Sequence, residues 1–253
     1  MAERSFLFVG GCVRSGTTAI TRLLNSHPEV IVGEERYIGA WGKHTVRAGH
    51  FEQDRYLDYQ EGDSTRGFYK FRDEAKRFGT ERYVGDKHPF VFWLYRDLER
   101  YFPRSRVVYI LRNPVSVVES AQIRSDDPDD RFKLDGWRAV TFWNDSIERT
   151  LAAISRGMKI LVVCYEDVFA SRERASLLYR TLGLDPDKAD WPRVDRLLAR
   201  ASKEASREVA RNEPLRKHVA SKASFDGYRD LASQCLFAGQ VAQESTGKGG
   251  IAH

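Results

Sequence analysis

The 253-residue sequence contains only three cysteines, two methionines and eight prolines. The odd and sparse set of cysteines excludes a disulfide framework and favours a reducing compartment, so we expect a cytoplasmic protein. No apolar run approaches the roughly 20 residues that a membrane span needs. The stretch before Phe6 is too short for a signal peptide. Collagen-like, low-complexity and coiled-coil architectures are excluded by the composition as a whole.

The length of the chain predicts one large domain with a core that needs no metal or disulfide for stability. We assign residues 1–238 to this single domain. Residues 239–253 are rich in glycine, alanine, glutamine and serine, which predicts a flexible C-terminal tail.

The charge balance favours an anionic partner, because the formal net charge is +5 and the pI is about 9.1. Between Arg193 and Lys217, eight basic residues stand against four acidic ones. This basic stretch is either a solvated helix face with partly paired charges or a basic lid over an anionic ligand. Its composition favours the solvated face.

Short apolar runs alternate with segments of helical periodicity. The predicted strands cover residues 6–9, 29–33, 83–87, 106–111 and 159–164. The predicted helices include residues 90–102, 137–154, 176–182 and one that starts with Asn113 as N-cap and Pro114 as first residue. Residues 36–82 are expected to form an irregular or helical excursion. The alternation predicts an α/β fold of the P-loop-like kind, with three α/β/α layers and a central, mostly parallel sheet.

A glycine-rich loop follows the first predicted strand and precedes a helix. Gly11 and Gly16 have the spacing of a P-loop, and Thr17 and Thr18 follow directly. The backbone N–H groups of such a loop bind phosphate at a helix N-terminus, and Arg14 adds a cation. The lysine of an ATP-splitting loop is missing, because Thr17 occupies its position. The loop is therefore predicted to hold a phosphate without hydrolysing a nucleoside triphosphate.

A second anion site is predicted at the end of another strand. Arg112 ends the strand over residues 106–111, and Ser120 and Arg124 lie four residues apart on one face of the following helix. Two guanidinium groups and a hydroxyl suit a second phosphate at some distance from the first. Together the two sites predict one ligand that carries two separate phosphates.

These motifs resemble those of the sulfotransferases that use 3′-phosphoadenosine 5′-phosphosulfate (PAPS). Val13–Thr18 resembles the family's 5′-phosphosulfate loop, and Tyr109–Ser120 resembles its 3′-phosphate motif. Val163–Asp167 is similar to its tyrosine-glutamate strand end. His27-Pro28, the Gly-Glu-Glu that ends at Glu35, and Lys87 before Pro89-Phe90 are most similar to the tyrosylprotein sulfotransferase branch in a soluble, bacterial form. Val13 and Asp86 depart from the branch, which has proline and asparagine there.

The resemblance implies a role for each matching residue. Glu35 would be the general base, and Lys87 and Arg14 would stabilise charge on the sulfuryl group and the leaving group. The residues implied to hold the 5′-phosphate are Arg14, Ser15, Gly16, Thr17 and Thr18, and those implied to hold the 3′-phosphate end are Arg112, Ser120, Arg124 and Tyr165. Glu34 and His88 remain alternative bases. The resemblance implies no metal.

The implied reaction moves a sulfuryl group from PAPS to an acceptor hydroxyl by in-line displacement and leaves 3′-phosphoadenosine 5′-phosphate (PAP). The acceptor is expected to be a peptidyl tyrosine or other phenol, or a carbohydrate hydroxyl, and residues 36–82 and 125–136 are expected to form its pocket. A P-loop kinase or NTPase with an atypical loop is one alternative function. A non-catalytic polyanion-binding module is another. No nucleic-acid partner is expected, and the oligomeric state is left open.

Overall fold

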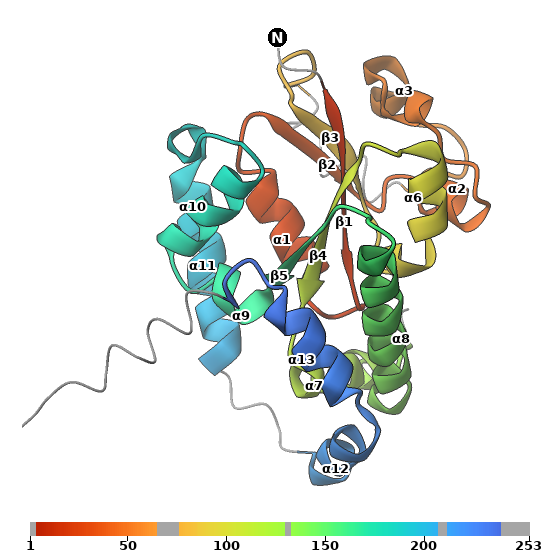
Figure 1. Ribbon diagram of the computed structural model, residues 1–253, viewed down its shortest axis with the longest axis vertical. Coiled ribbons are helices and arrows are strands. Elements are labelled where there is room, and N and C mark those ends of the chain that lie inside the picture. Colours follow the sequence, from red (N-terminus) through yellow and green to blue (C-terminus); the bar gives the residue numbers. More distant parts are fainter. Residues whose placement is uncertain (1–3, 65–75, 130–132, 207–211, 239–253) are drawn as a thin grey trace, which may run out of the picture.

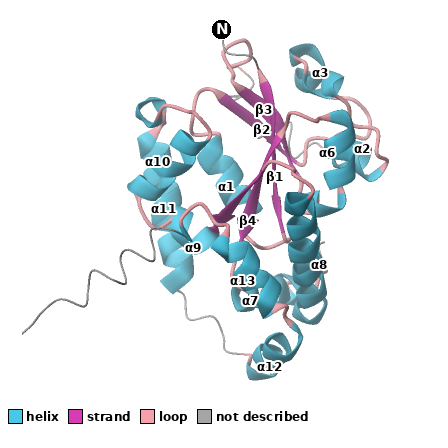
Figure 2. Ribbon diagram, in the orientation of Figure 1, coloured by secondary structure: helices cyan, strands magenta, loops and turns pink. Residues whose placement is uncertain are grey.

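The computed structural model describes residues 4–64, 76–129, 133–206 and 212–238. A five-stranded parallel sheet, in the order β2-β3-β1-β4-β5, forms its centre. The strands are β1 (Ser5–Gly11), β2 (Val30–Glu34), β3 (Tyr83–Lys87), β4 (Arg106–Leu111) and β5 (Ile160–Cys164). Their carboxyl ends share one edge of the sheet (Figure 2). The predicted α/β fold is confirmed, and the described sheet is parallel throughout.

The strands bury side chains on both faces of the sheet because successive residues point in opposite directions. Leu7 and Val9 of β1 pack in one core, and Phe8 between them packs in a second. Helices lie on both sides in Figure 1, which gives the three predicted layers. On one side are α1 (Thr17–Leu24), α10 (Arg172–Thr181) and α11 (Trp191–Ser206), and on the other α2 (Ile38–Gly42), α6 (Tyr95–Tyr101) and α8 (Gly136–Ser155).

The other described helices include several short turns, the longer α7 and two helices near residue 238. They are η1 (Ala48–Phe51), α3 (Gln53–Leu57), η2 (Val91–Trp93), α7 (Pro114–Asp126), α9 (Tyr165–Val168), η3 (Pro186–Lys188), α12 (Glu213–Lys222) and α13 (Phe225–Ser233). The short helices α2, η1 and α3 fall in the segment that was expected to be irregular or helical. The proposed acceptor segments lie partly outside the described residues, at 65–75 and 130–132.

Capping residues fix where two of the helices begin. The Asn113 side chain accepts the N–H of Val115 and Pro114 is the first residue of α7, so this predicted helix start is confirmed. Helix α10 begins at Arg172, four residues before the predicted start, because the Ser171 side chain caps it by accepting the N–H of Arg174.

The single helix predicted over residues 90–102 is wrong in its first half. The chain forms the 3-10 turn η2 there, and α6 begins only at Tyr95. Val91 packs so tightly on β1 that a Cβ on Gly10 would lie 2.0 Å from its Cγ1. The rings of Phe90 and Trp93 stack with centroids 4.7 Å apart. Contact with the sheet therefore overrides the helical periodicity of this segment.

Within the described ranges, none of the helices combines the length and apolar composition that crossing a membrane requires. The predicted tail, residues 239–253, lies outside the described residues. The assignment of one domain with a flexible tail therefore stays a prediction.

Candidate functional site

The strand order brings the predicted site residues to neighbouring strand ends. The central strand β1 runs into the loop that ends at Gly16. On one side of β1, Lys87 ends β3 and Glu35 follows β2; on the other side, Arg112 follows β4 and Tyr165 follows β5. Ligands of parallel α/β folds bind at this edge, where the strand order diverges from a central strand.

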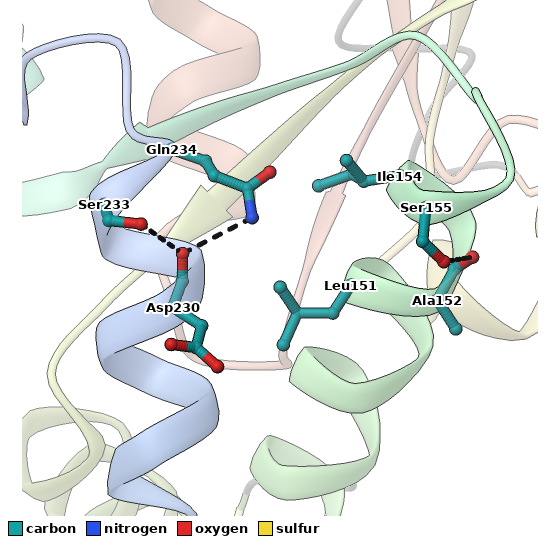
Figure 3. Close-up of a pocket in the computed structure, with 7 residues that line it drawn as sticks. All are labelled: Leu151, Ala152, Ile154, Ser155, Asp230, Ser233 and Gln234. Atoms are coloured by element: carbon teal, nitrogen blue, oxygen red, sulfur yellow. Dashed lines mark hydrogen bonds between the residues drawn. The ribbon is translucent and has the colours of Figure 1, made fainter.

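A shallow groove between α8 and α13 lies elsewhere (Figure 3). It has a volume of about 620 Å³ and is lined by Leu151, Ala152, Ile154, Ser155, Asp230, Ser233 and Gln234. Four of these residues belong to the last turns of α8, which lead to the start of β5 rather than to its end. The groove is therefore separate from the edge that carries the predicted site.

The glycine-rich loop is held in shape from within. Ser15 is buried, and its hydroxyl and its N–H both donate to the carbonyl of Cys12, at 2.6 and 3.0 Å. Gly16 has φ +100 and is the N-cap of α1, with no side-chain cap. A Cβ on Gly16 would lie 2.5 Å from Cδ2 of Tyr165, so only glycine fits beneath this ring. The first N–H groups of α1, which begins at Thr17, have no partner within the helix and suit an anion.

The loop and the second motif are in direct contact. Arg14 donates from Nε and Nη2 to the Ser120 hydroxyl at 3.1 and 2.9 Å. Arg112 donates from Nη1 to the Arg14 carbonyl at 3.3 Å, and its Cζ lies 4.2 Å from the centroid of the Tyr165 ring. Arg124 lies one turn beyond Ser120 on α7. The structure therefore joins the two predicted anion sites into one surface.

Arg112 has unused hydrogen-bonding capacity within this surface. Its Nε is buried and lacks a hydrogen-bond partner among the described residues. A buried donor without an acceptor costs free energy, and an anionic oxygen would satisfy it. This donor is the observation that fits a phosphate at the second motif.

On the other side of β1, Lys87 and Glu35 form an ion pair. The Lys87 Nζ lies 2.6 Å from Glu35 Oε1, with the lysine side chain buried and the glutamate 26% exposed. Glu35 has φ +65, a strained conformation for a residue with a side chain, and its N–H donates to the Lys87 carbonyl at 2.9 Å. Strain of this kind concentrates at functional sites. The next residue in the sequence, Arg36, pairs with Asp63 at 2.8 Å.

The two alternative bases are placed differently from Glu35. The Glu34 side chain is buried and pairs with Arg22 of α1 at 3.2 Å. His88 accepts the N–H of Phe90 at Nδ1, and burial lowers its pKa to about 4. His88 is therefore neutral at pH 7. Cys12 is buried, which raises the pKa of its thiol and leaves it unreactive.

Asp86 organises the predicted site, a role that no sequence pattern indicated. Its fully buried carboxylate accepts the N–H groups of Arg36 and Lys87 at Oδ1, and those of Tyr37 and Trp41 Nε1 at Oδ2. Burial raises the pKa of Asp86 to about 6, against these four donors. The contacts fix the turn that carries Glu35. The only signal in the sequence was an acid directly before Lys87 at a strand end.

Replacing Asp86 should change how stability depends on pH. Its pKa rises from 3.8 to about 6 on folding, so its contribution to stability is fully present below about pH 4 and is lost as the pH rises through 6. A pKa change of about two is worth about 3 kcal/mol. Urea unfolding between pH 4 and pH 8 should show the stability of the wild type, relative to Asp86→Asn, falling by up to this amount. A constant or rising difference would contradict the assignment.

The described part of the basic stretch contains ion pairs with neighbouring elements. Arg216 of α12 donates from Nε to the buried Glu119 of α7 at 2.9 Å, and Asp195 of α11 pairs with Arg172 of α10. These contacts agree with a helix face whose charges are partly paired. Residues 207–211, in the middle of the stretch, lie outside the described residues.

Comparison with known proteins assigns the chain to a family. Residues 7–190 match the profile of the sulfotransferase family. The chain belongs to this family. The prediction of the family from the sequence motifs is thereby confirmed, and with it the assignment to a family of transferases.

The chain is similar to curated proteins named as protein-tyrosine sulfotransferases. The chain is 31% identical to protein-tyrosine sulfotransferase 2 of Gallus gallus over 155 residues, which is 58% of this chain and 41% of that protein. It is 25% identical to protein-tyrosine sulfotransferase 1 of Danio rerio over 182 residues, 68% of this chain and 51% of that protein. The matches thus span about half the length of these relatives.

Among solved structures, the sulfotransferase domain from the curacin biosynthetic pathway is similar, with a TM-score of 0.52. It is 14% identical, and the similarity covers 87% of this chain and 98% of that domain. At this identity the likeness concerns the fold alone.

Proposed function

We propose that the protein transfers the sulfuryl group of PAPS to the hydroxyl group of an acceptor. Family membership supports the reaction class. The observation that carries the choice of donor is the joined surface of the glycine-rich loop, Tyr165 and Arg112, with the unsatisfied Nε of Arg112 within it. PAPS has phosphate groups at both ends of its ribose, which matches two anion sites that touch each other.

The strand order supports a division of the site into two halves. In the proposal, the loop residues Ser15–Thr18 bind the 5′-phosphate. Arg112, Ser120, Arg124 and Tyr165, beyond β4 and β5, bind the 3′-phosphate end. These two sets of residues form the donor half of the site. Arg14 belongs to the same half, because its side chain donates to Ser120. Glu35 and Lys87, beyond β2 and β3, form the half in which the acceptor reacts.

In the proposed reaction, Glu35 takes the proton of the acceptor hydroxyl while the hydroxyl oxygen attacks sulfur. The bond between sulfur and the 5′-phosphate oxygen breaks, and its electron pair stays on the leaving phosphate. Lys87 stabilises the charge that develops there. The ion pair supports both roles, because it holds the carboxylate and the ammonium together, 2.6 Å apart, beyond the ends of β2 and β3.

We propose a phenol, such as a peptidyl tyrosine, or a carbohydrate hydroxyl as acceptor. Similarity to proteins named protein-tyrosine sulfotransferases supports the phenol. Trp93 is 44% exposed and stacks on Phe90, three residues after Lys87, which offers a planar surface near this end of β3. Its indole N–H donates to Asp145 at 2.6 Å, so the ring is held in place. A cytoplasmic location stays a prediction.

Calorimetric titration with PAP tests the proposed donor. With EDTA present, the purified chain should bind PAP with micromolar affinity, or about −8 kcal/mol. ATP and AMP, which lack a 3′-phosphate, should bind at least tenfold more weakly.

Two results would contradict the proposed donor. ATP binding that requires Mg²⁺, with no binding of PAP, would favour the P-loop kinase or NTPase. Binding of RNA with a steep salt dependence, again without PAP binding, would favour the polyanion-binding module.

A further inference from the structure

Two of the three cysteines meet at the end of β5, outside the residues that the proposed reaction uses. Cys164 is the last residue of β5, and Cys235 follows α13. The Cys164 N–H donates to Cys235 Sγ at 2.9 Å. Asp167 of α9 completes the group: both sulfur atoms and an Asp167 carboxylate oxygen lie within 4.8 Å of one another. The two cysteines are 71 positions apart in the sequence, so the fold alone creates this cluster.

We propose that Cys164, Cys235 and Asp167 bind a divalent, borderline-soft cation such as Zn²⁺. Zinc prefers thiolate, imidazole and carboxylate ligands in a tetrahedral arrangement. With Zn–S bonds of about 2.3 Å, the two sulfur atoms of a tetrahedral site are about 3.8 Å apart. The three donors therefore need only small movements to reach the ion. Solvent can supply the fourth ligand, since Cys164 and Asp167 are partly exposed.

Local geometry favours a metal site over a simple contact between thiols. Cys164 is the N-cap of α9 and Asp167 lies three residues later, so both face the same side of this turn. The N–H that reaches Cys235 Sγ is the kind of outer hydrogen bond that orients a thiolate ligand. Among the described residues, no hydrogen bond or ion pair engages the Asp167 carboxylate. A disulfide would leave this carboxylate without a role.

The site would fasten the end of the described chain to the strand that carries Tyr165. β5 is the last strand of the sheet, and the N–H of Leu236 donates to the Val162 carbonyl at 2.9 Å, on its open edge. A cation held by Cys164 and Cys235 would lock this contact. Tyr165, the next residue after Cys164, packs over Gly16 and beneath Arg112. The cation would thus act structurally, beside the donor half, without touching the reacting groups.

Titration with Co²⁺, which replaces zinc and is visible by absorption, tests the site. The full chain, with no histidine tag, is stripped of metal by a chelator and kept reduced with a phosphine. One equivalent of Co²⁺ should produce a thiolate-to-cobalt charge-transfer band and the visible bands of a tetrahedral site. Zn²⁺ should abolish both and raise the Tm.

Variants assign the ligands. Cys235→Ser should weaken the charge-transfer band. Asp167→Asn should lower the Co²⁺ affinity at least about tenfold, which is the lower end of the loss caused by mutating even an outer-shell partner of a metal. Asp230→Asn, which removes an exposed carboxylate on α13, is the matched control and should bind Co²⁺ normally. Cys12 is present in every variant, so a signal that came from Cys12 alone would not change between them.

Three results would overturn the proposal. The first is the absence of a charge-transfer band in the wild type. The second is equal Co²⁺ affinity in Asp167→Asn and Asp230→Asn, which decides the question even if Cys235→Ser fails to fold. The third is a Cys164–Cys235 disulfide in the purified protein with no Co²⁺ uptake after reduction, which would identify a redox pair instead.

Discussion

Glu35→Gln is expected to lower turnover by about two to four decades, the range typical of a lost general base. Glutamine keeps the shape of the side chain and can still contact Lys87, but it cannot accept the acceptor's proton. The affinity for PAP should remain within a few-fold of the wild type, because PAP contacts the other half of the proposed site. Turnover is measured with a phenolic acceptor at saturating PAPS.

The matched controls for Glu35 are the two alternative bases. Glu34→Gln should retain most activity, because Glu34 faces Arg22 rather than Lys87. His88→Ala should also retain measurable turnover. If Glu35→Gln kept near-normal turnover and one of the two controls lost decades of turnover, the general base would be the residue replaced in that control.

Arg112→Ala is expected to weaken PAP binding by about 10–150-fold, which corresponds to the 1.5–3 kcal/mol of a hydrogen bond to a charged group. The alanine removes the buried Nε donor and the guanidinium that lies over Tyr165. The PAP affinity of Arg112→Lys should lie between those of the wild type and Arg112→Ala, because lysine restores the charge without the planar fork of donors. Calorimetric titration with PAP measures all three affinities.

Arg106→Ala is the matched control, since Arg106 is an exposed arginine at the opposite end of the same strand. Its PAP affinity should equal that of the wild type. AMP, which lacks a 3′-phosphate, should bind the wild type and Arg112→Ala alike. If Arg112→Ala weakened the binding of AMP and of PAP equally, Arg112 would contact the 5′-phosphate or support the fold instead of binding the 3′-phosphate.

The strands could be predicted from the sequence because their signals are local. The run from Val107 to Leu111 is continuous and apolar, as expected of a strand buried on both faces. The glycine-rich loop was equally readable, because Gly11 and Gly16 stand at a fixed spacing after a strand. The predicted helix over residues 90–102 failed because Val91 packs on a strand some eighty residues earlier, a contact that no local pattern contains.

The site was predicted as a set of residues but not as an arrangement. The hydrogen bond between Arg14 and Ser120 spans 106 positions, and the ion pair between Glu35 and Lys87 spans 52. Glu34 and Glu35 are adjacent in sequence but have different partners, Arg22 and Lys87. Which of them meets the lysine depends on the strained turn after β2 and on the donors around Asp86, and both arise only in the folded chain.

The position of β1 at the centre of the sheet has a consequence for folding during synthesis. Its partners are β3 and β4, so β1 has no neighbouring strand until β3 (Tyr83–Lys87) has left the ribosome. The glycine-rich loop gains its ring cover only after Tyr165 is made. Nascent chains that end before β3 expose the apolar faces of β1, the kind of surface that makes an incomplete chain prone to aggregate.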